Sequence, residues 1–282
     1  MKLSIDYQAD YLYEAEASLS PHVARVLPRT DLFVKVHHRA FTTHPTGDIQ
    51  YRRDLFDNLI AYCFYPEPIR ELPFRMELEI EVGERNPFHF LLDSRGLHIP
   101  CDYMPSERAV LDVFLKPAGG ALALPAPLSP TGKRPTVETL VTMNLWLHEN
   151  IAYERREEGE AFAPAETLER ESGACRDVAV LFAEVLRRNG VAARLASGFV
   201  WEGDKEEGER RAESAMHAWV EACLPGAGWI GMDPTNGVFC DHHFITTAVG
   251  FEPADVSPVS GTYYGRTKIE SRLTTALDIR KI

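Results

Sequence analysis

Cys175 follows Ser172, Gly173 and Ala174 at the expected start of a helix, where a thiol can become a nucleophile. Backbone N–H groups in a first helical turn have no partner within the helix, and the helix dipole adds partial positive charge there. Both effects favour the thiolate over the thiol. The Cys175 amide can also donate to an oxyanion that forms in front of the sulfur. A buried structural thiol is the alternative interpretation.

His217 and Asp233 are the residues that can complete a nucleophilic site around this thiol. His217 begins the segment MHAWVEACL, and Asp233 ends GWIGMD directly before Pro234. If these two strands pair through the short turn at residues 225–228, their ends meet, and the carboxylate can then hold the imidazole as an acceptor. Taken singly, His217 is typical of a core histidine and Asp233 of a turn residue. Together with Cys175 they predict acyl transfer.

The elements that must position these three residues are two helices and three strands. A helix is expected over residues 136–150, and a stronger helical pattern begins at Cys175 and continues to Asn189. The apolar positions of the second helix are Val178, Leu181, Phe182, Val185 and Leu186. Strands are expected at 191–201, 216–224 and 228–233. One helix followed by antiparallel strands predicts an α+β fold for residues 136–282.

The first part of the chain, residues 1–115, is expected to be a β-rich sandwich domain. Short apolar runs at 32–38, 58–65 and 74–82 are separated by Pro, Gly, Asn and Asp. The third run alternates apolar residues with glutamates, which predicts one buried face and one wet face. Residues 116–135 are crowded with Pro, Gly and Ala, so they are predicted to be a linker.

Composition sets limits on the function. The chain has 282 residues and a net charge of −12, which argues against a nucleic-acid partner because phosphates require a basic face. No signal-peptide run or membrane-length apolar stretch is present in the sequence, so we expect no membrane partner. Five cysteines make an odd number without paired spacing, which favours free thiols in a reducing cytoplasm.

Three segments of the sequence resemble the bacterial transglutaminase-like superfamily, which has a papain-like cysteine protease fold: SGACRDVAVLFAEVLRRNGVAARLASGFVW, MHAWVEACLPGAGWIGMDPTNG and DVSPVSGTYYG. The resemblance covers about residues 136–265. It implies Cys175 as nucleophile, His217 as general base and Asp233 as the residue that orients it. Residues 1–105 resemble the β-rich N-terminal domain that often precedes this catalytic domain in bacteria, through LSPHVARVLPR and RRDLFDNLIAYCFYP.

Two positions depart from the family pattern. Arg176 follows the nucleophile where Gln is more frequent in close relatives, and Met216 precedes the base where Ser is usual. Neither change removes a catalytic atom, so both bear on substrate choice. Trp146 is a candidate second oxyanion donor by analogy with animal transglutaminases. A core tryptophan is the competing interpretation.

The expected chemistry is acyl transfer at an amide carbonyl of a protein or peptide substrate, through a thioester on Cys175. Hydrolysis by a peptidase or amidase is favoured, because water is abundant and an amine route needs a dry channel and a lysine-binding site. A protein cross-linking transglutaminase is the second hypothesis. An inactive binding scaffold of the same fold and a hydrolase of the peptide N-glycanase kind are further alternatives.

No metal or cofactor is expected. Cys240, His242 and His243 have metal-ligand types, but adjacent histidines in a strand point to opposite faces, and His37 and His38 meet the same objection. The acidic and basic segment 202–214 lacks the Asp-rich pattern of a calcium loop. It is expected to be a solvated hairpin tip, and the charged run at 154–160 is expected to be a solvated loop. Activity is therefore expected to be independent of calcium.

Overall fold

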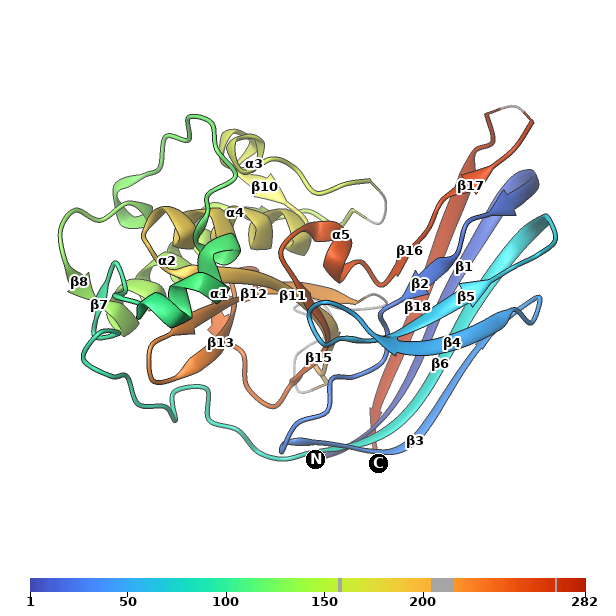
Figure 1. Ribbon diagram of the computed structural model, residues 1–282, viewed down its shortest axis with the longest axis horizontal. Helices are drawn as coiled ribbons and strands as arrows, with labels where there is room; N and C mark the ends of the chain where they lie inside the picture. Colours follow the sequence, from blue (N-terminus) through green and yellow to red (C-terminus); the bar gives the residue numbers. More distant parts are fainter. Residues whose placement is uncertain (157–158, 204–215, 267) are drawn as a thin grey trace.

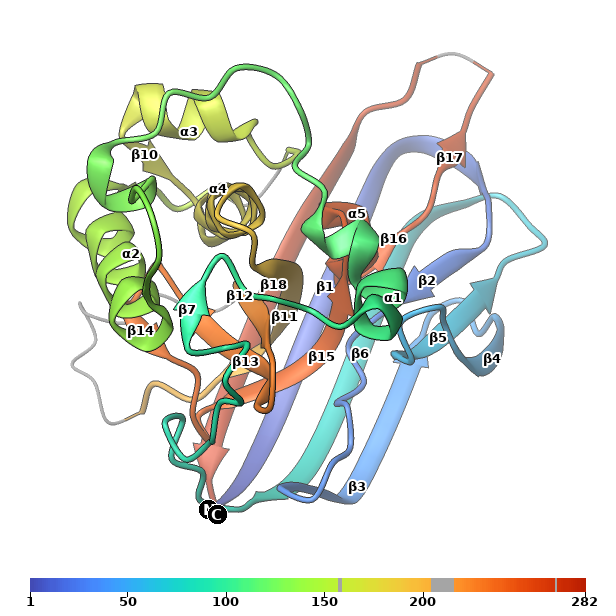
Figure 2. The same ribbon diagram turned by 60° about the vertical axis from the view of Figure 1, so that its left-hand side comes forward.

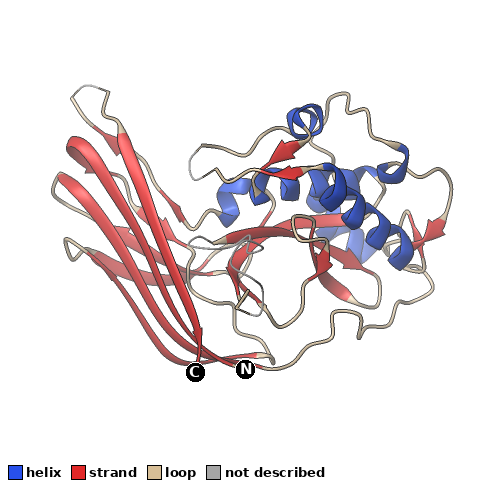
Figure 3. Ribbon diagram, turned by 180° about the vertical axis from the view of Figure 1, so that it is seen from behind, coloured by secondary structure: helices blue, strands red, loops and turns tan. Residues whose placement is uncertain are grey.

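The computed structural model describes residues 1–156, 159–203, 216–266 and 268–282. It places a helix-containing part beside a part built from long strands (Figure 1). Figure 3 shows that the helices gather on the first part, whereas the second is made of strands. The two chain termini lie together at one end of the strand-rich part, where the Ile282 N–H donates to the Lys2 carbonyl at 3.1 Å.

Long antiparallel strands form the main sheet of the strand-rich part. Strand β1 (Lys2–Leu19) lies between β6 (Ile69–Val82) and β18 (Ser271–Lys281), and β3 (Val34–Thr43) pairs with the other edge of β6. The alternation expected in β6 is confirmed, since its four apolar residues from Met76 to Val82 are buried. A one-faced pattern of this kind requires a second layer over the apolar face.

A shorter sheet supplies that layer. It has the order β16-β2-β5-β4, formed by β16 (Val259–Ser260), β2 (His22–Ala24), β5 (Leu59–Phe64) and β4 (Asp48–Arg53). Side chains of both sheets meet in one apolar core that includes Leu3, Ile5, Ala61 and Cys63. The β-rich sandwich expected for the N-terminal region is therefore present.

A five-stranded antiparallel sheet of order β14-β13-β12-β11-β15 organises the helix-containing part. Its strands are β11 (Ala192–Val200), β12 (His217–Leu224), β13 (Gly228–Asp233), β14 (Val238–Phe239) and β15 (Phe244–Gly250). Helix α4 (Cys175–Arg188) packs against β11 and β12 (Figure 2). The α+β class and the main elements expected here are confirmed.

The remaining elements surround this sheet and helix, except β17, which pairs with β1 of the sandwich. They are α1 (Pro105–Leu115), α2 (Thr136–Asn150), α3 (Pro164–Arg170), α5 (Pro253–Val256), the 3₁₀ turn η1 (Ala126–Leu128), β7 (His98–Ile99), β8 (Arg134–Pro135), β9 (Ala152–Tyr153), β10 (Ser172–Gly173) and β17 (Tyr263–Tyr264). None of the described helices is long and apolar enough to span a bilayer.

The packing of the chain differs from the expected domain ranges at two places. Residues 99–114 belong to the core of the helix-containing part, because Ile99, Leu111 and Phe114 are buried there against α4 and its sheet. Conversely, β16, β17 and β18 complete the sandwich, although they lie in the range 136–282. The half-buried residues of β18, such as Leu277, pack against the N-terminal core, which the N-terminal strands alone would leave partly uncovered.

The segment expected as a linker, residues 116–135, packs on the helix-containing part. Leu128 is fully buried in its core. The Ala118 N–H donates to the buried Glu184 carboxylate at 2.8 Å, and Arg188 donates to the Gly120 carbonyl at 3.0 Å. Hydrogen bonds to Glu184 and from Arg188 of α4 therefore hold the segment in place, which composition alone does not predict.

Candidate active site

The N-terminus of α4 presents Cys175 at the first helical position, after Ala174 in extended conformation. Gly173 precedes it, and a side chain there would approach the Asp177 Cβ at 2.9 Å. A glycine therefore allows β10 to turn closely onto the helix. The thiol is half-buried. The amide of a first helical residue has no partner within the helix, so the Cys175 N–H is placed to donate to a developing oxyanion.

His217 and Asp233 meet as the hairpin interpretation predicted. Strands β12 and β13 pair in the register Val220 to Met232 and Leu224 to Gly228, with the turn between them. The His217 Nε2 lies 2.9 Å from Asp233 Oδ2, and both side chains are buried. The Trp219 ring stacks beside the imidazole at a centroid distance of 6.5 Å. Because a carboxylate only accepts, Nε2 carries the proton and Nδ1 is left for the thiol.

Asp233 is itself held by the turn that follows it. Its Oδ1 accepts from the Thr235 N–H at 2.9 Å, and its Oδ2 accepts from the Asn236 side-chain amide at 2.6 Å. The Asn236 side chain thus supports the carboxylate that holds His217. The spacing of Asn236, three residues after an aspartate in DPTNG, is typical of a turn in which side chains satisfy the backbone.

The three residues form a coupled electrostatic group. Burial would raise the pKa of Cys175, but the charge of His217 and the Ala218 N–H lower it below its ordinary value. Burial would lower the pKa of His217, yet the charges of Asp233 and Cys175 hold that pKa well above its ordinary value. Burial would raise the pKa of Asp233, but His217 and its hydrogen-bond donors lower it. This pattern favours a thiolate–imidazolium pair.

The Cys175 thiol and the His217 imidazole influence each other through their charges. His217 Nδ1 is buried, and no well-aligned hydrogen bond to it forms among the described residues. The pKa of Cys175 is nevertheless lowered mainly through its interaction with His217. A close charge pair that has not tightened into a linear hydrogen bond is common in active sites without substrate.

Asp177 is a further residue of this site that the sequence analysis did not identify. Its carboxylate is fully buried at the third position of α4. Oδ2 accepts from the Ala174 N–H at 2.7 Å, and Oδ1 accepts from the Phe162 N–H at 2.8 Å and from Arg156 at 2.6 Å. Arg156 also covers the Phe162 ring at 3.7 Å. The signal available in the sequence was an acidic residue in the first turn of a helix.

The loop at 154–160 is therefore more than the solvated segment expected. Within its described residues, the Glu154 N–H donates to the Gly173 carbonyl at 2.9 Å. Arg156 pairs with buried Asp177, and Arg176 donates to the Arg156 carbonyl at 2.8 Å. A buried carboxylate needs a cationic partner, and this requirement draws the loop onto the helix that carries Cys175.

The other four cysteines lack a partner like His217, and burial is the largest cause of the shifts in their pKa values. Burial raises the pKa of Cys63, of Cys101 and of Cys223 to about 11. Burial, followed by the charge of Asp233, raises the pKa of Cys240 well above its ordinary value. Cys175 is the cysteine whose pKa is lowered.

Trp146 and Met216, singled out in the sequence, lie apart from this chemistry. Trp146 is half-buried against the core and lines a hollow of about 400 Å³ formed with residues 121–125 and α3, a lining that contains none of the three reactive residues. This placement favours the core interpretation for Trp146. Met216 packs against the core shared with the sandwich, which also includes Phe199 and Ile245.

His242 and His243 do not point to opposite faces as expected for a strand, because the segment turns. The His242 and His243 rings lie on the same side, with centroids 4.3 Å apart. Ligand atoms of Asp241, His242 and His243 lie within 4.8 Å of one another. Cys240 is buried in the apolar cluster around Trp219. Asp241 Oδ1 accepts from the backbone and ring N–H groups of His243 at 2.9 and 2.8 Å, so a turn-stabilising carboxylate accounts for the cluster.

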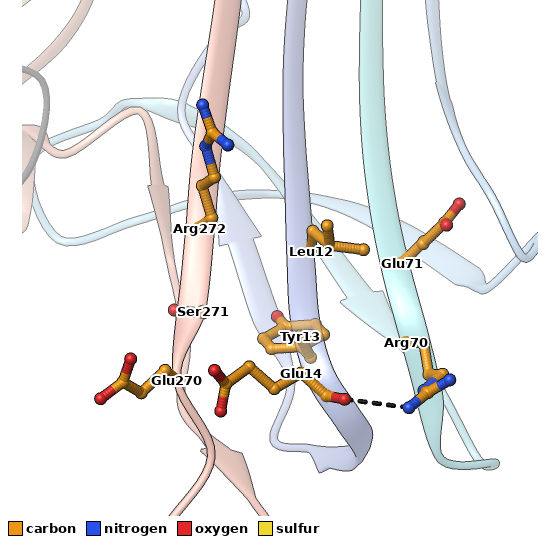
Figure 4. A pocket seen from close by; sticks show the side chains of 8 residues that line it. All are labelled: Leu12, Tyr13, Glu14, Arg70, Glu71, Glu270, Ser271 and Arg272. Carbon is orange, nitrogen blue, oxygen red and sulfur yellow. Dashed lines mark hydrogen bonds between the residues drawn. The ribbon is translucent and has the colours of Figure 1, made fainter.

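Most of the other charged segment considered, 202–214, lies outside the described residues. A separate hollow of about 430 Å³ lies on the long-stranded sheet, between β1, β6 and the start of β18. Figure 4 shows its mixed acidic and basic lining, in which Arg70 donates to the Glu14 carbonyl at 2.9 Å. This hollow contains none of the three reactive residues.

Comparisons with known proteins agree with this arrangement. The transglutaminase-like superfamily matches residues 125–234, and the bacterial transglutaminase-like N-terminal region matches residues 3–81. An uncharacterized protein of Mycobacterium tuberculosis is 26% identical over 98% of this chain and 91% of its own length. One from Mycobacterium leprae is 24% identical, over 94% of each chain.

A solved structure shares the whole fold. It is titled a "Putative Cysteine Protease" from Cytophaga hutchinsonii, with a TM-score of 0.74, 16% identity, and coverage of 99% of this chain and 90% of that one. At this identity the likeness shows the fold. Residues 125–234 of the chain match the transglutaminase-like superfamily, behind a match to the bacterial transglutaminase-like N-terminal region at residues 3–81.

Proposed function

We propose that this protein is a cysteine hydrolase that cleaves amide bonds of a protein or peptide, with Cys175 as nucleophile, His217 as general acid and base, and Asp233 as the residue that orients His217. The observation that carries the proposal is the buried His217–Asp233 contact of 2.9 Å beside a helix N-terminal thiol whose pKa is lowered. The match to the transglutaminase-like superfamily supports the assignment as an enzyme, and the geometry of the site supports this type of reaction.

The reaction follows from the charge state of the pair. The Cys175 thiolate attacks the amide carbonyl carbon, and the oxyanion that forms accepts from the Cys175 N–H. The His217 imidazolium then donates its Nδ1 proton to the departing amine, so that the C–N bond breaks and a thioester remains. Neutral His217 next takes a proton from water, which attacks the thioester. The acid leaves, and the thiolate and imidazolium are restored.

Hydrolysis is preferred to cross-linking as the fate of the thioester. Cys175 is only partly buried, and water is present at far higher concentration than an amine. Thiolate chemistry also requires Cys175 in its reduced form. We therefore propose the cytoplasm as the compartment, in keeping with five free cysteines.

The test is a comparison of wild type with Cys175→Ala on a library of amide-bonded peptides, with calcium or with a calcium chelator. We expect release of new termini or ammonia that needs Cys175, proceeds without calcium and does not incorporate a labelled primary amine. Efficient, saturable amine incorporation would replace the hydrolase with a cross-linking enzyme. An absence of any Cys175-dependent turnover, together with ordinary reactivity of the thiol, would favour a binding scaffold.

A further inference from the structure

The turn between β14 and β15 gathers three side chains of metal-ligand type: Asp241, His242 and His243. One ligand atom from each lies within 4.8 Å of the others, and this is the one such group in the ranges that the structure describes. The two imidazole rings lie 4.3 Å apart between their centroids. The three side chains are 30, 25 and 31% exposed, so an ion from solvent can reach them.

The turn itself uses only one oxygen of the Asp241 carboxylate. Oδ1 accepts from the backbone N–H and from Nδ1 of His243. Oδ2 lies 3.9 Å from His242 Nδ1, which is too long for a hydrogen bond. His242 Nδ1 is buried and has no hydrogen-bond partner in the described part of the chain. The carboxylate and the His242 imidazole therefore face each other across a gap that no hydrogen bond closes.

The width of this gap suits two ligands of one metal ion. Bonds of about 2.0–2.2 Å from a tetrahedral zinc ion to nitrogen and oxygen place its ligand atoms about 3.4 Å apart. The gap of 3.9 Å exceeds this separation by about 0.5 Å, which a small rotation of the partly exposed His242 side chain removes. A buried nitrogen without a partner also costs free energy, and coordination to an ion would recover it.

The types of the three side chains select the class of ion. Imidazole nitrogen suits zinc, nickel and copper, whereas calcium and magnesium require oxygen ligands. No lysine or arginine in the described ranges pairs with the Asp241 carboxylate, and Arg85 donates instead to the Asp241 backbone carbonyl at 3.3 Å. Cys240 is buried in the apolar cluster around Trp219, so its sulfur is directed away from solvent. The ligand set is therefore two imidazoles and one carboxylate.

We propose that Asp241, His242 and His243 form a binding site for a divalent transition-metal ion of the zinc class. Its ligands are Asp241 Oδ2, His242 Nδ1, one ring nitrogen of His243, and water at the fourth position. The site is independent of the proposed hydrolase activity. The preceding residue, Cys240, donates its N–H to the Gly231 carbonyl in β13 at 2.9 Å. A bound ion therefore stabilises the edge of the sheet that carries Asp233.

Isothermal titration calorimetry with zinc chloride measures the site. The parent for these titrations is Cys175→Ala, so that the reactive thiolate cannot bind the ion. His242→Phe keeps a ring of similar size and removes a ligand nitrogen that has no hydrogen-bond partner. Asp241→Asn keeps an oxygen toward His243 and replaces Oδ2 by an amide. His37→Phe is the matched control, because His37 also precedes a second histidine and lies 3.0 Å from a carboxylate, that of Glu81.

We expect the parent to bind a single zinc ion. His242→Phe and Asp241→Asn should each bind zinc about 100-fold more weakly, because even the partners of metal ligands change affinity by about 10- to 100-fold. His37→Phe should bind zinc as the parent does, and calcium in excess should not compete. Zinc should also raise the thermal unfolding temperature of the parent but not of His242→Phe.

Three calorimetric outcomes would overturn the proposal. The first is a parent that binds no zinc to saturation. The second is an equal loss of affinity in His242→Phe and His37→Phe, which would show binding to scattered histidines. The third is binding that requires Cys175, which would place the ion at the reactive thiol.

Cobalt(II) tests the identity of the ligands in the same proteins. A tetrahedral cobalt site with nitrogen and oxygen ligands absorbs visible light, and the Cys175→Ala parent should show this spectrum while His242→Phe should not. A cobalt–thiolate charge-transfer band in the near ultraviolet would contradict the assignment, because it would show that a cysteine sulfur binds the ion.

Discussion

His217 and Asp233 lie on neighbouring antiparallel strands, and their side chains meet at 2.9 Å where β12 begins and β13 ends. The contact depends on a turn of three residues and on a carboxylate that four donors hold: the imidazole, the Thr235 N–H, the Asn236 N–H and the Asn236 side-chain amide. A buried acceptor held in this way fixes one tautomer of the imidazole. Nδ1 is thereby left for Cys175.

The first prediction concerns thiol reactivity. Cys175 should react with iodoacetamide near pH 6 well before the other four cysteines, because its pKa is lowered while burial raises the pKa values of the others. Mass spectrometry of peptides after timed labelling measures the order. His217→Ala is the control, since it should slow the labelling of Cys175 alone. Similar rates at all accessible cysteines in wild type would contradict an activated nucleophile.

Replacing Asp233 by Asn tests the orientation of His217. The new amide can keep its oxygen toward the Thr235 N–H, which turns its nitrogen toward His217 Nε2. The imidazole must then carry its proton on Nδ1, where it cannot accept one from the thiol. We expect a fall in kcat of about 10²- to 10⁴-fold with an unchanged circular dichroism spectrum. Normal turnover in this variant would mean that another group, such as Asn236, holds the histidine.

The pH profile of kcat/KM should be bell-shaped. The thiolate forms as pH rises through the lowered pKa of Cys175, so the acid limb lies below the ordinary thiol range. The imidazolium is lost as pH rises through the raised pKa of His217, so the alkaline limb lies above the ordinary imidazole range. The two limbs belong to the coupled pair. In Asp233→Asn, the residual activity should show an alkaline limb at lower pH, because the charge that raises the pKa of His217 is gone.

Arg156 should contribute to stability through Asp177. In Arg156→Met the fully buried carboxylate keeps its backbone donors but loses its cationic partner. We expect a loss of about 2–3 kcal/mol in the free energy of unfolding, at the lower end for a broken buried pair because the arginine is partly exposed. Urea denaturation measures the loss. Arg108→Met, at an exposed position of α1, is the matched control and should change stability by less than about 0.5 kcal/mol.

The C-terminal strand should stabilise the sandwich from its inner face. Leu277 points toward the N-terminal core, whereas its neighbour Ala276 is exposed. Leu277→Asp should lower the free energy of unfolding by about 1–3 kcal/mol, and Ala276→Asp should have little effect. Thermal unfolding of the two variants is the measurement. Equal effects would mean that β18 is attached to the sheet without contributing to its core.

Local patterns in the sequence were enough to predict the elements that carry the reactive residues, and also strand β6 of the sandwich. The helical spacing from Val178 to Leu186, the alternation in β6 and the short turn before β13 depend on contacts within a few residues or within one hairpin. The secondary structure around Cys175 and the meeting of His217 with Asp233 follow from such contacts, and the structure agrees with both.

Tertiary packing decided the rest, because it joins residues that no local periodicity connects. The pairing of β18 with β1 links the two ends of the chain, so the sandwich includes residues that follow the reactive domain in sequence. Arg156 and the Phe162 N–H donate hydrogen bonds to Asp177, and a buried carboxylate needs such donors. They come from a segment that no local pattern connects to α4. The placement of Cys175 beside His217 has the same origin. It depends on how α4 packs against β12. The sequence predicts an apolar face on each element, but it does not predict how the two faces are aligned.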